Sequence, residues 1–127
     1  MKNTIYTSVE EALALYRILI EKFGGDFGVR DLGLLESALL RPRSSYYQSL
    51  STQAAALLHS LLLNHCFVDG NKRLAFTLTA TFLKINGIDF QVSADEAEEF
   101  IVEQIIKNQA DASAIASWIE KHSSLGS

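Results

Sequence analysis

Apolar residues recur at helical spacing along almost the whole chain, and this periodicity restricts its possible folds more than any other feature. Ser8 followed by Glu11 forms a capping-box pattern before the first periodic run. Ser93 followed by Glu96 repeats that pattern later in the chain. The sequence therefore predicts an all-α fold: a compact bundle of about six helices, in a single domain over residues 1–127.

Glycines, the single proline and capping side chains set the expected helix boundaries. Asp31 and Asp111 are expected N-caps, and Pro42 closes the second helix. Either Ser51 or Thr52 is expected to open the third helix. The expected helices cover residues 9–23, 32–41, 53–64, 71–86, 94–108 and 112–119.

The third helix is apolar on most sides, so we expect it and the fourth helix to form the centre of the bundle. The loop between them is then held at the junction of two buried helices. We expect residues 88–93 to be extended and residues 42–50 to form a loop or flap. The last five residues are expected to be frayed.

Composition excludes several classes of protein. A hydrophobic fraction of 48% with 20% charged residues argues against disorder. Lys and Arg total 11 against 15 Asp and Glu, and this net charge of −4 argues against broad nucleic-acid binding. The N-terminus has no apolar signal region, and no apolar stretch reaches the roughly 18 residues of a membrane span. One cysteine allows no internal disulfide, so we expect a cytoplasmic protein.

Polar groups are concentrated between two apolar segments in residues 65–76, HCFVDGNKRLAF. If a helix begins at Asn71, its first backbone N–H groups are unpaired and its dipole adds partial positive charge. Gly70 allows a tight turn and a close approach by a ligand. Lys72 and Arg73 add two formal charges. Together these groups predict a binding site for phosphate.

Asp69 and His65 complete the chemistry that this segment suggests. A carboxylate beside a polyphosphate is repelled unless a cation lies between them, and Mg²⁺ commonly fills that place. The ordinary pKa of histidine makes His65 a usable general base at neutral pH. A base, a metal-binding carboxylate and a cationic phosphate site are the parts that phosphoryl or nucleotidyl transfer to a hydroxyl requires.

These residues resemble the core motif of the Fic/Doc superfamily, H-x-F-x-(D/E)-(G/A)-N-(G/K)-R. The positions that fit are His65, Phe67, Asp69, Gly70, Asn71 and Arg73. Upstream, GVRDLGLLESALLRP is similar to a second signature of the death-on-curing (Doc) branch, and FLKING after the motif also has that branch's character. The resemblance runs from about Phe23 to Asp89, and it implies the Fic/Doc fold.

Lys72 and Phe76 decide the branch of the superfamily that the chain resembles. AMP-transferring Fic enzymes typically carry glycine at the first position and a second arginine at the other. The resemblance to death-on-curing toxins implies the opposite orientation of ATP and transfer of its γ-phosphate, with ATP and Mg²⁺ required. It also implies a threonine of elongation factor Tu as target, an arrest of translation, and neutralisation by the C-terminal segment of a small antitoxin that is disordered when free.

The resemblance assigns a role to each matching residue. His65 would deprotonate the target hydroxyl, while Asp69 would hold Mg²⁺ and help to orient the histidine. Gly70 and Asn71 would form the phosphate site. Phosphate charge would be neutralised by the cationic pair Lys72 and Arg73. Phe67 is expected to anchor the loop, and Cys66 stands where AMP-transferring members usually have proline.

Two other functions stay open at this stage. The same fold could transfer AMP, or it could be a catalytically silent module that only binds a nucleotide. Simpler structural interpretations also exist for the motif. His65 could be a structural histidine at a helix end, Asp69 an N-cap, and Lys72 and Arg73 a solvated pair.

Further pairings in the sequence suggest other sites. A dyad of Cys66 and His65 is disfavoured because adjacent side chains usually diverge. A transition-metal site of His59, Asn64, His65 and Asp69 is disfavoured because the two histidines fall on different helical faces. His59 is expected to be a satisfied polar residue. The segment with Arg41, Arg43, Tyr46 and Tyr47 is either a flap that positions the target chain or a surface loop.

Overall fold

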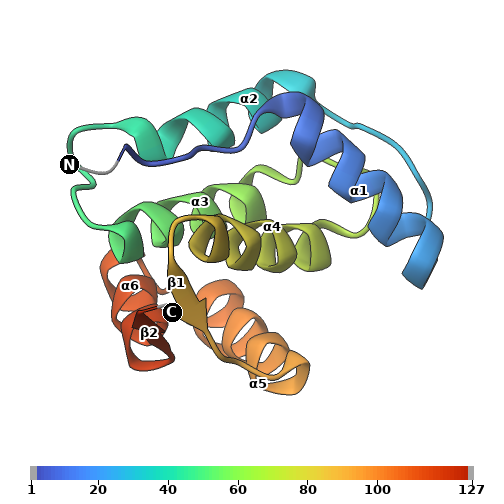
Figure 1. The fold of residues 1–127 in the computed structure, drawn as a ribbon. Helices are drawn as coiled ribbons and strands as arrows, with labels where there is room; N and C mark the ends of the chain where they lie inside the picture. The colour runs from blue at the N-terminus through green and yellow to red at the C-terminus, as the bar shows by residue number, and fades with distance from the viewer. Residues whose placement is uncertain (1–2, 126–127) are drawn as a thin grey trace.

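The computed structural model describes residues 3–125, and this range is largely helical (Figure 1). The elements in chain order are α1 (Val9–Phe23), α2 (Leu32–Leu40), the 3-10 turn η1 (Arg41–Arg43), α3 (Leu50–Asn64), α4 (Asn71–Ile85), β1 (Ile88–Phe90), α5 (Ala94–Glu99), the π-helical η2 (Phe100–Lys107), α6 (Ala112–Lys121) and β2 (Ser123–Leu125). The predicted all-α fold class is confirmed. In the described range no helix is long and apolar enough to cross a membrane.

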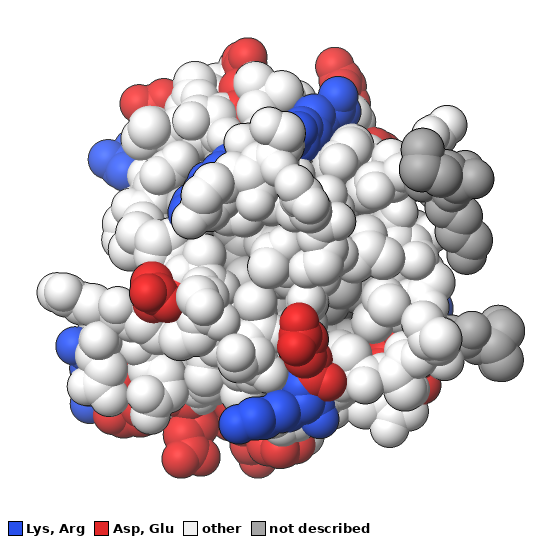
Figure 2. All heavy atoms as spheres, turned by 90° about the vertical axis from the view of Figure 1, so that its left-hand side faces the viewer, with Lys and Arg blue, Asp and Glu red and all other residues white. Residues whose placement is uncertain are grey.

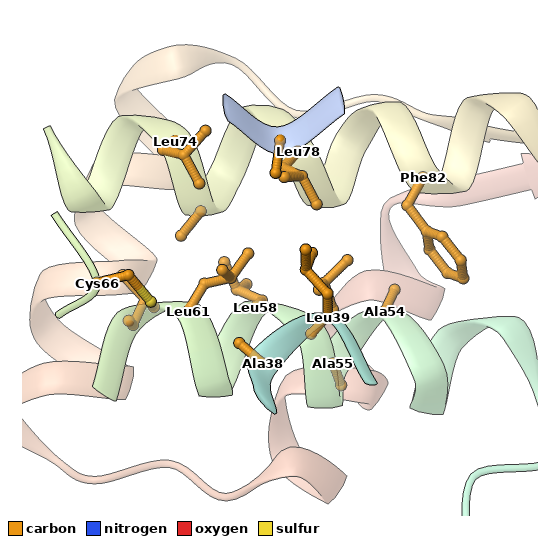
Figure 3. Packing of buried hydrophobic residues seen from close by; sticks show 14 of the residues in the cluster. Ala38, Leu39, Ala54, Ala55, Leu58, Leu61, Cys66, Leu74, Leu78 and Phe82 are labelled. Atoms are coloured by element: carbon orange, nitrogen blue, oxygen red, sulfur yellow. The ribbon is translucent and has the colours of Figure 1, made fainter. Parts of the chain in front are cut away.

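The pair α3 and α4 forms the middle layer of the molecule (Figure 1). Helices α1 and α2 lie on one side of this pair, and α5, α6 and the two strands lie on the other. Figure 3 shows Leu58 and Leu61 of α3 pointing toward Leu74 and Leu78 of α4. All four are at most 2% exposed, and burial of each such side chain stabilises the fold by about 1.5–3 kcal/mol. The predicted central position of these two helices is confirmed.

Capping side chains begin the helices where the sequence pattern placed them. Ser8 and Glu11 exchange both bonds of a capping box at the start of α1, and Ser93 with Glu96 does the same at α5. Asp31 accepts from the backbone N–H of Leu34 to cap α2. Asp111 likewise caps α6. Local hydrogen-bonding groups therefore determine most helix starts.

The start of α3 was predicted three residues too late. The helix begins at Leu50, and Ser49 is its N-cap instead of Ser51 or Thr52. The Ser49 hydroxyl accepts from the Thr52 amide at 3.2 Å, and the Thr52 hydroxyl accepts from the Ser49 amide at 3.2 Å. A run of hydroxyl residues offers several caps, and the one that completes a reciprocal pair is used.

The end of the chain differs from its prediction. Residues 123–125 are not frayed; they form β2, which pairs antiparallel with β1, with Phe90 opposite Ser123 and Ile88 opposite Leu125. The extended segment predicted over residues 88–93 is confirmed for the part that forms β1. This pairing joins segments far apart in sequence, so no local pattern signals it. Residues 126–127 of the predicted frayed end lie outside the described residues.

Charge is dispersed on the face of the molecule that Figure 2 shows. Uncharged atoms cover most of this face, and basic and acidic side chains lie interspersed on it. Sequence-independent binding of a nucleic acid needs a continuous basic surface that displaces counterions from phosphates. The face in this view does not present one.

Candidate active site

The chain leaves α3 through His65, which adopts the left-handed conformation at φ 47° and ψ 57°. Such a backbone is uncommon for a residue other than glycine and costs on the order of 1–3 kcal/mol. It turns the chain so that Cys66 and Phe67 enter the core at 0% and 2% exposure, while His65 stays exposed. Two buried neighbours thus anchor the loop beside an accessible imidazole, and the predicted anchoring by Phe67 is confirmed.

A segment between α1 and α2 runs along this loop and binds its backbone. Val29 forms an isolated β-bridge with Phe67. The Val68 amide donates to the Gly28 carbonyl at 2.9 Å. Arg30 donates from its backbone and its guanidinium to carbonyls at the end of α3 and in the loop. The loop that follows His65 is therefore held by hydrogen bonds from outside its own sequence neighbourhood.

Tyr16 of α1 also contacts this loop. It is 1% exposed, and its ring stacks on Phe67 with centroids 3.8 Å apart. Its hydroxyl donates to the Asp69 carbonyl at 2.9 Å. Sequence reasoning did not identify Tyr16 or Arg30 as parts of the site. Tyr16 belongs to no quoted motif, and Arg30 lies in the upstream signature, where no role was assigned to it.

The Asp69 carboxylate is exposed and fixed by two backbone N–H groups. Oδ2 accepts from Asp26 at 3.0 Å and Oδ1 accepts from Gly70 at 2.8 Å. These bonds, with a smaller contribution from the charge of Arg73, lower the pKa of Asp69 below its usual value. A β-carbon at Gly25 would lie 2.9 Å from Oδ2, so glycine there makes room for this carboxylate. Asp69 is therefore ionised at neutral pH.

Asp69 does not cap the helix that follows, as one structural interpretation suggested. The N-cap of α4 is Gly70, in the left-handed conformation at φ 78°, and no side chain caps this end. The first N–H groups of α4 have no partner within the helix. The helix dipole also favours an anion at this position. The start of α4 thus has the free donors that a phosphate site requires.

Lys72 and Arg73 are exposed beside these N–H groups. Lys72 Nζ lies 3.4 Å from the Glu98 carboxylate of α5, and both side chains are about half exposed. The Arg73 guanidinium lies 4.3 Å from the centre of the Phe23 ring. Among the described residues neither cation has a buried ion-pair partner, so both are accessible to a phosphate.

The Asn71 side chain has a contact that the motif did not suggest. Its oxygen accepts from the Phe67 amide at 3.1 Å, and its nitrogen donates to the Phe67 carbonyl at 2.8 Å. The amide group therefore closes the loop on itself. The assignment of Asn71 to phosphate positioning stays a prediction. Because its side chain is bonded to Phe67, the group of Asn71 best placed to bind a phosphate is its backbone N–H.

A cleft of about 640 Å³ brings the predicted site residues together. The predicted site residues that line it are His65, Asp69, Gly70, Asn71, Lys72 and Arg73. Its other wall comes from α5 and η2, through Ala97, Glu98, Ile101 and Ile106. No local sequence pattern identifies these residues as part of the site, because only the packing of α5 and η2 brings them close to the motif. The imidazole and the cationic helix start thus face one space.

The donors in this cleft fit magnesium better than a transition metal. No group of three or more His, Cys, Asp or Glu side chains gathers within residues 3–125 in a way that could hold a metal ion. One ionised, exposed carboxylate suits Mg²⁺, which is usually held by one or two carboxylates together with substrate phosphates and water. Asp69 can supply that ligand. His59 belongs to a different cluster and cannot join it.

Cys66 does not act with His65 as a dyad. The thiol is fully buried, and burial raises its pKa above the ordinary value. A thiol of this kind carries little thiolate and is a poor nucleophile. Its contribution is to packing at the end of α3, where Figure 3 places it among core side chains.

A second polar cluster surrounds Arg41 on the other part of α3. The Arg41 guanidinium contacts His59 Nδ1 at 3.0 Å and donates to the Ser60 hydroxyl at 2.8 Å and the Tyr47 hydroxyl at 2.9 Å. His59 is therefore a satisfied polar residue, as predicted. Tyr47 is half-buried but Tyr46 is 83% exposed. The flap and the surface-loop interpretations of this segment both stay predictions.

Comparison with known proteins finds relatives for most of the chain. A family model described as the Fic/DOC family matches residues 6–83. A protein named Toxin Doc, from Mycolicibacterium smegmatis (strain ATCC 700084 / mc(2)155), is 44% identical over 103 residues, or 74% of this chain and 77% of the relative. A protein named Protein kinase doc, from Escherichia phage P1, is 31% identical over 97 residues, or 73% and 77% of the two chains. The family match includes α3, the loop after it, and α4 up to residue 83.

Proposed function

The chain belongs to the Fic/DOC family, and on this premise we propose that it is the toxin of a toxin–antitoxin module. We propose further that it transfers the γ-phosphoryl group of ATP to a hydroxyl of elongation factor Tu and so halts translation. One observation carries the chemical part of the proposal. His65 and the cationic start of α4 line the same cleft.

In the proposed reaction, His65 accepts the proton of the target hydroxyl. The hydroxyl oxygen then bonds to the γ-phosphorus, the bond from that phosphorus to the β–γ bridging oxygen breaks, and ADP leaves. His65 is suited to this role because its side chain is exposed to the cleft while its backbone is fixed. General-base assistance of this kind contributes about 10²–10⁴-fold in rate.

The start of α4 binds the phosphates in this proposal. The unpaired N–H groups of the first turn donate to phosphate oxygens, and Lys72 and Arg73 offset the charge that grows on the leaving ADP. Asp69 would hold Mg²⁺, which when bound would neutralise part of the phosphate charge. The low pKa of Asp69 keeps it ionised for that purpose.

Two features favour γ-phosphoryl transfer over AMP transfer. Lys72 replaces the glycine that is typical of AMP-transferring members, and its ammonium group lies at the cleft. Phe76 stands where those members have a second arginine; it also lines the cleft, with its ring 6.1 Å from that of Phe90. The relative from phage P1 carries the name of a protein kinase.

The proposed antitoxin is a small protein that binds through its C-terminal segment. Apolar side chains that the protein leaves exposed on α1 and just after it support such a partner: Ile18, Phe23, Phe27 and Val29. A segment that is disordered when free can cover an apolar surface of this kind as it folds.

Labelled ATP tests the reaction. The purified protein is incubated with elongation factor Tu and ATP labelled at either the α- or the γ-phosphate. We expect the γ label on elongation factor Tu, and no transfer by His65→Ala or Asp69→Ala. Transfer of the α label would establish AMP transfer instead. A cell extract in place of the purified factor identifies another target if elongation factor Tu stays unlabelled.

A test in cells addresses the toxin assignment. Expression of the wild-type chain without an antitoxin is expected to arrest growth, and the same two substitutions are expected to relieve the arrest. Harmless high-level expression of the wild type would contradict the assignment and favour a silent nucleotide-binding module.

A further inference from the structure

Arg30 contacts three successive carbonyl groups at the point where α3 becomes the catalytic loop. Its guanidinium donates from Nη2 to Asn64 at 3.0 Å and from Nε to His65 at 2.7 Å. Its backbone N–H donates to Cys66 at 2.8 Å. One residue from the segment before α2 therefore grips the backbone on both sides of the imidazole-bearing residue.

These contacts fall on a backbone that needs support. His65 has φ 47°, a conformation that side-chain-bearing residues seldom adopt. It is also the C-cap of α3, at the end of a helix where carbonyl groups have no partner within the helix. Without external donors, the Asn64 and His65 carbonyls would be free to turn toward water and the loop free to leave this conformation.

Arginine is the side chain that suits the position. Its Nε and Nη2 hydrogens point in parallel from one edge of a planar group, so they can reach two adjacent carbonyls at once. Its charge also lies at the negative end of the α3 dipole. Among the described residues no carboxylate lies within 4.0 Å of its guanidinium. The side chain is thus committed to the backbone of the loop.

We propose that Arg30 is a positioning residue for His65. It fixes the left-handed turn from which the imidazole enters the cleft, so that the base meets the acceptor hydroxyl at the phosphate site. This proposal rests on the proposed function in one respect: the transfer assay that tests it presupposes that activity. Arg30 itself contacts the backbone of His65, and it is not among the residues that line the cleft.

The proposal differs from a simple helix cap in what a substitution changes. A cap contributes stability, and its loss leaves turnover intact wherever the protein is folded. A positioning residue sets the placement of one group, and misplacement by about 1 Å can cost about 10²-fold in turnover. Nucleotide binding is expected to be spared, because Arg30 directs its hydrogen bonds to residues 64–66 and is not among the residues that line the cleft.

The experiment compares Arg30→Ala and Arg30→Lys with the wild type, at a temperature where all are folded by circular dichroism. Arg30→Lys keeps the charge but cannot donate to two carbonyls in parallel, so it stays informative if the alanine variant folds poorly. Arg17→Ala is the matched control, because Arg17 is an exposed arginine whose guanidinium only stacks on the Phe27 ring.

Three quantities are measured: the Kd of a non-hydrolysable ATP analogue, the rate of γ-label transfer to elongation factor Tu, and amide hydrogen exchange at residues 66–68. The His65 ring proton resonance is followed as well; with three histidines in the chain, it is assigned from its loss in His65→Ala.

We expect both Arg30 variants to keep the analogue Kd within about twofold, while transfer falls by about 10²-fold in Arg30→Ala and about tenfold in Arg30→Lys. Exchange at residues 66–68 is expected to accelerate and the His65 resonance to shift. Arg17→Ala is expected to match the wild type in every readout.

Transfer by both variants within about twofold of the wild type would overturn the proposal, and so would an unchanged His65 resonance with unchanged exchange. If the wild type itself transfers no label, the proposed function has failed, and the resonance and exchange data decide the role of Arg30 alone.

Discussion

Two histidines, one within α3 and one at its C-cap, lie six positions apart and occupy opposite kinds of polar surroundings. His59 is half-buried in the cluster around Arg41, where its Nδ1 faces the guanidinium at 3.0 Å. His65 is exposed at the cleft, and no hydrogen bond to its ring is formed by residues 3–125. Around His59 the side chains satisfy one another; around His65 the backbone is satisfied and the side chain is left free.

The difference separates a polar cluster whose side chains pair with one another from the proposed active site. Arg41 directs its Nε and Nη1 donors to Tyr47, Ser60 and His59, so these side chains pair with one another. At the other end of the helix, carbonyls and amides of the loop are paired, but the imidazole and two cations face solvent. A site that binds a substrate needs side chains whose hydrogen-bonding groups are unpaired, on a backbone that is held rigid.

The largest effect expected from substituting the two histidines is on the rate of phosphoryl transfer. His65→Ala is expected to reduce phosphoryl transfer by about 10²–10⁴-fold with little change in stability, since the ring makes no bond in the described protein. His59→Ala is expected to keep transfer within about twofold and to lower the free energy of unfolding by about 1 kcal/mol, the net value of one hydrogen bond. Transfer assays and urea unfolding of the two variants measure both quantities.

The opposite pattern would contradict the contrast. A catalytic loss in His59→Ala at full stability would make the Arg41 cluster part of the active site. Unchanged transfer by His65→Ala would remove the assignment of the base.

Asn71 offers a test inside the motif itself, with the next largest effect. Asn71→Ala removes two hydrogen bonds to the Phe67 backbone and leaves its half-buried groups unpaired, so we expect a loss of about 1–3 kcal/mol in the free energy of unfolding. Transfer is expected to fall as well, because the loop loses its closure. Thermal unfolding and the transfer assay measure the two effects.

A loss of ATP affinity at unchanged stability would show that the side chain serves the phosphate, as the motif alone suggested. Asn71→Asp is the matched variant, since it keeps the acceptor for the Phe67 amide and removes the donor for its carbonyl.

The parts of the fold that local chemistry determines were predictable from the sequence. Capping side chains and apolar spacing fix the helices within a few residues, and the central pair follows from a helix that is apolar on most sides. The motif likewise predicted the placement of its polar groups at one junction, because they are neighbours in sequence. Only the start of α3, where several hydroxyl residues compete, was misplaced among the helix starts.

The parts that depend on distant contacts were not predictable. The donor to His65 is 35 positions away, and the donor to the Asp69 carbonyl is 53 positions away. The second wall of the cleft comes from α5 and η2, after the motif, and β2 forms only because β1 is there to pair with it. The sequence around an arginine or a tyrosine does not show which distant carbonyl group the fold will bring to its side chain.

Glu98 sharpens the contrast at the cleft, with a smaller expected effect. Its carboxylate holds Lys72 at 3.4 Å, so an arriving phosphate must displace an exposed ion pair. Such pairs contribute about 0.2–1 kcal/mol, and Glu98→Gln is therefore expected to tighten ATP binding by about two- to fivefold. Isothermal titration with a non-hydrolysable ATP analogue measures the change, and Glu103→Gln, which breaks an exposed pair with Lys107, is the control. Weaker binding in Glu98→Gln would mean that Glu98 assists the nucleotide, for instance through Mg²⁺.

The smallest effect expected is on the pH dependence of stability, and it returns to the two histidines. Burial lowers the pKa of His59 below its ordinary value of 6.5; the charge of Arg41 lowers it further, and Asp111 opposes the shift. As the pH falls below about 6.5, the unfolded chain takes up this proton before the folded protein does. Stability is therefore expected to decline from about pH 6.5 down to the folded-state pKa of His59, by less than one proton's worth of slope. Urea unfolding at several pH values measures the slope, which is expected to flatten in His59→Gln and to persist in His65→Gln. If the slope vanished in His65→Gln instead, the histidine whose titration is coupled to unfolding would be the one at the cleft. The contrast drawn between the surroundings of the two histidines would then be wrong.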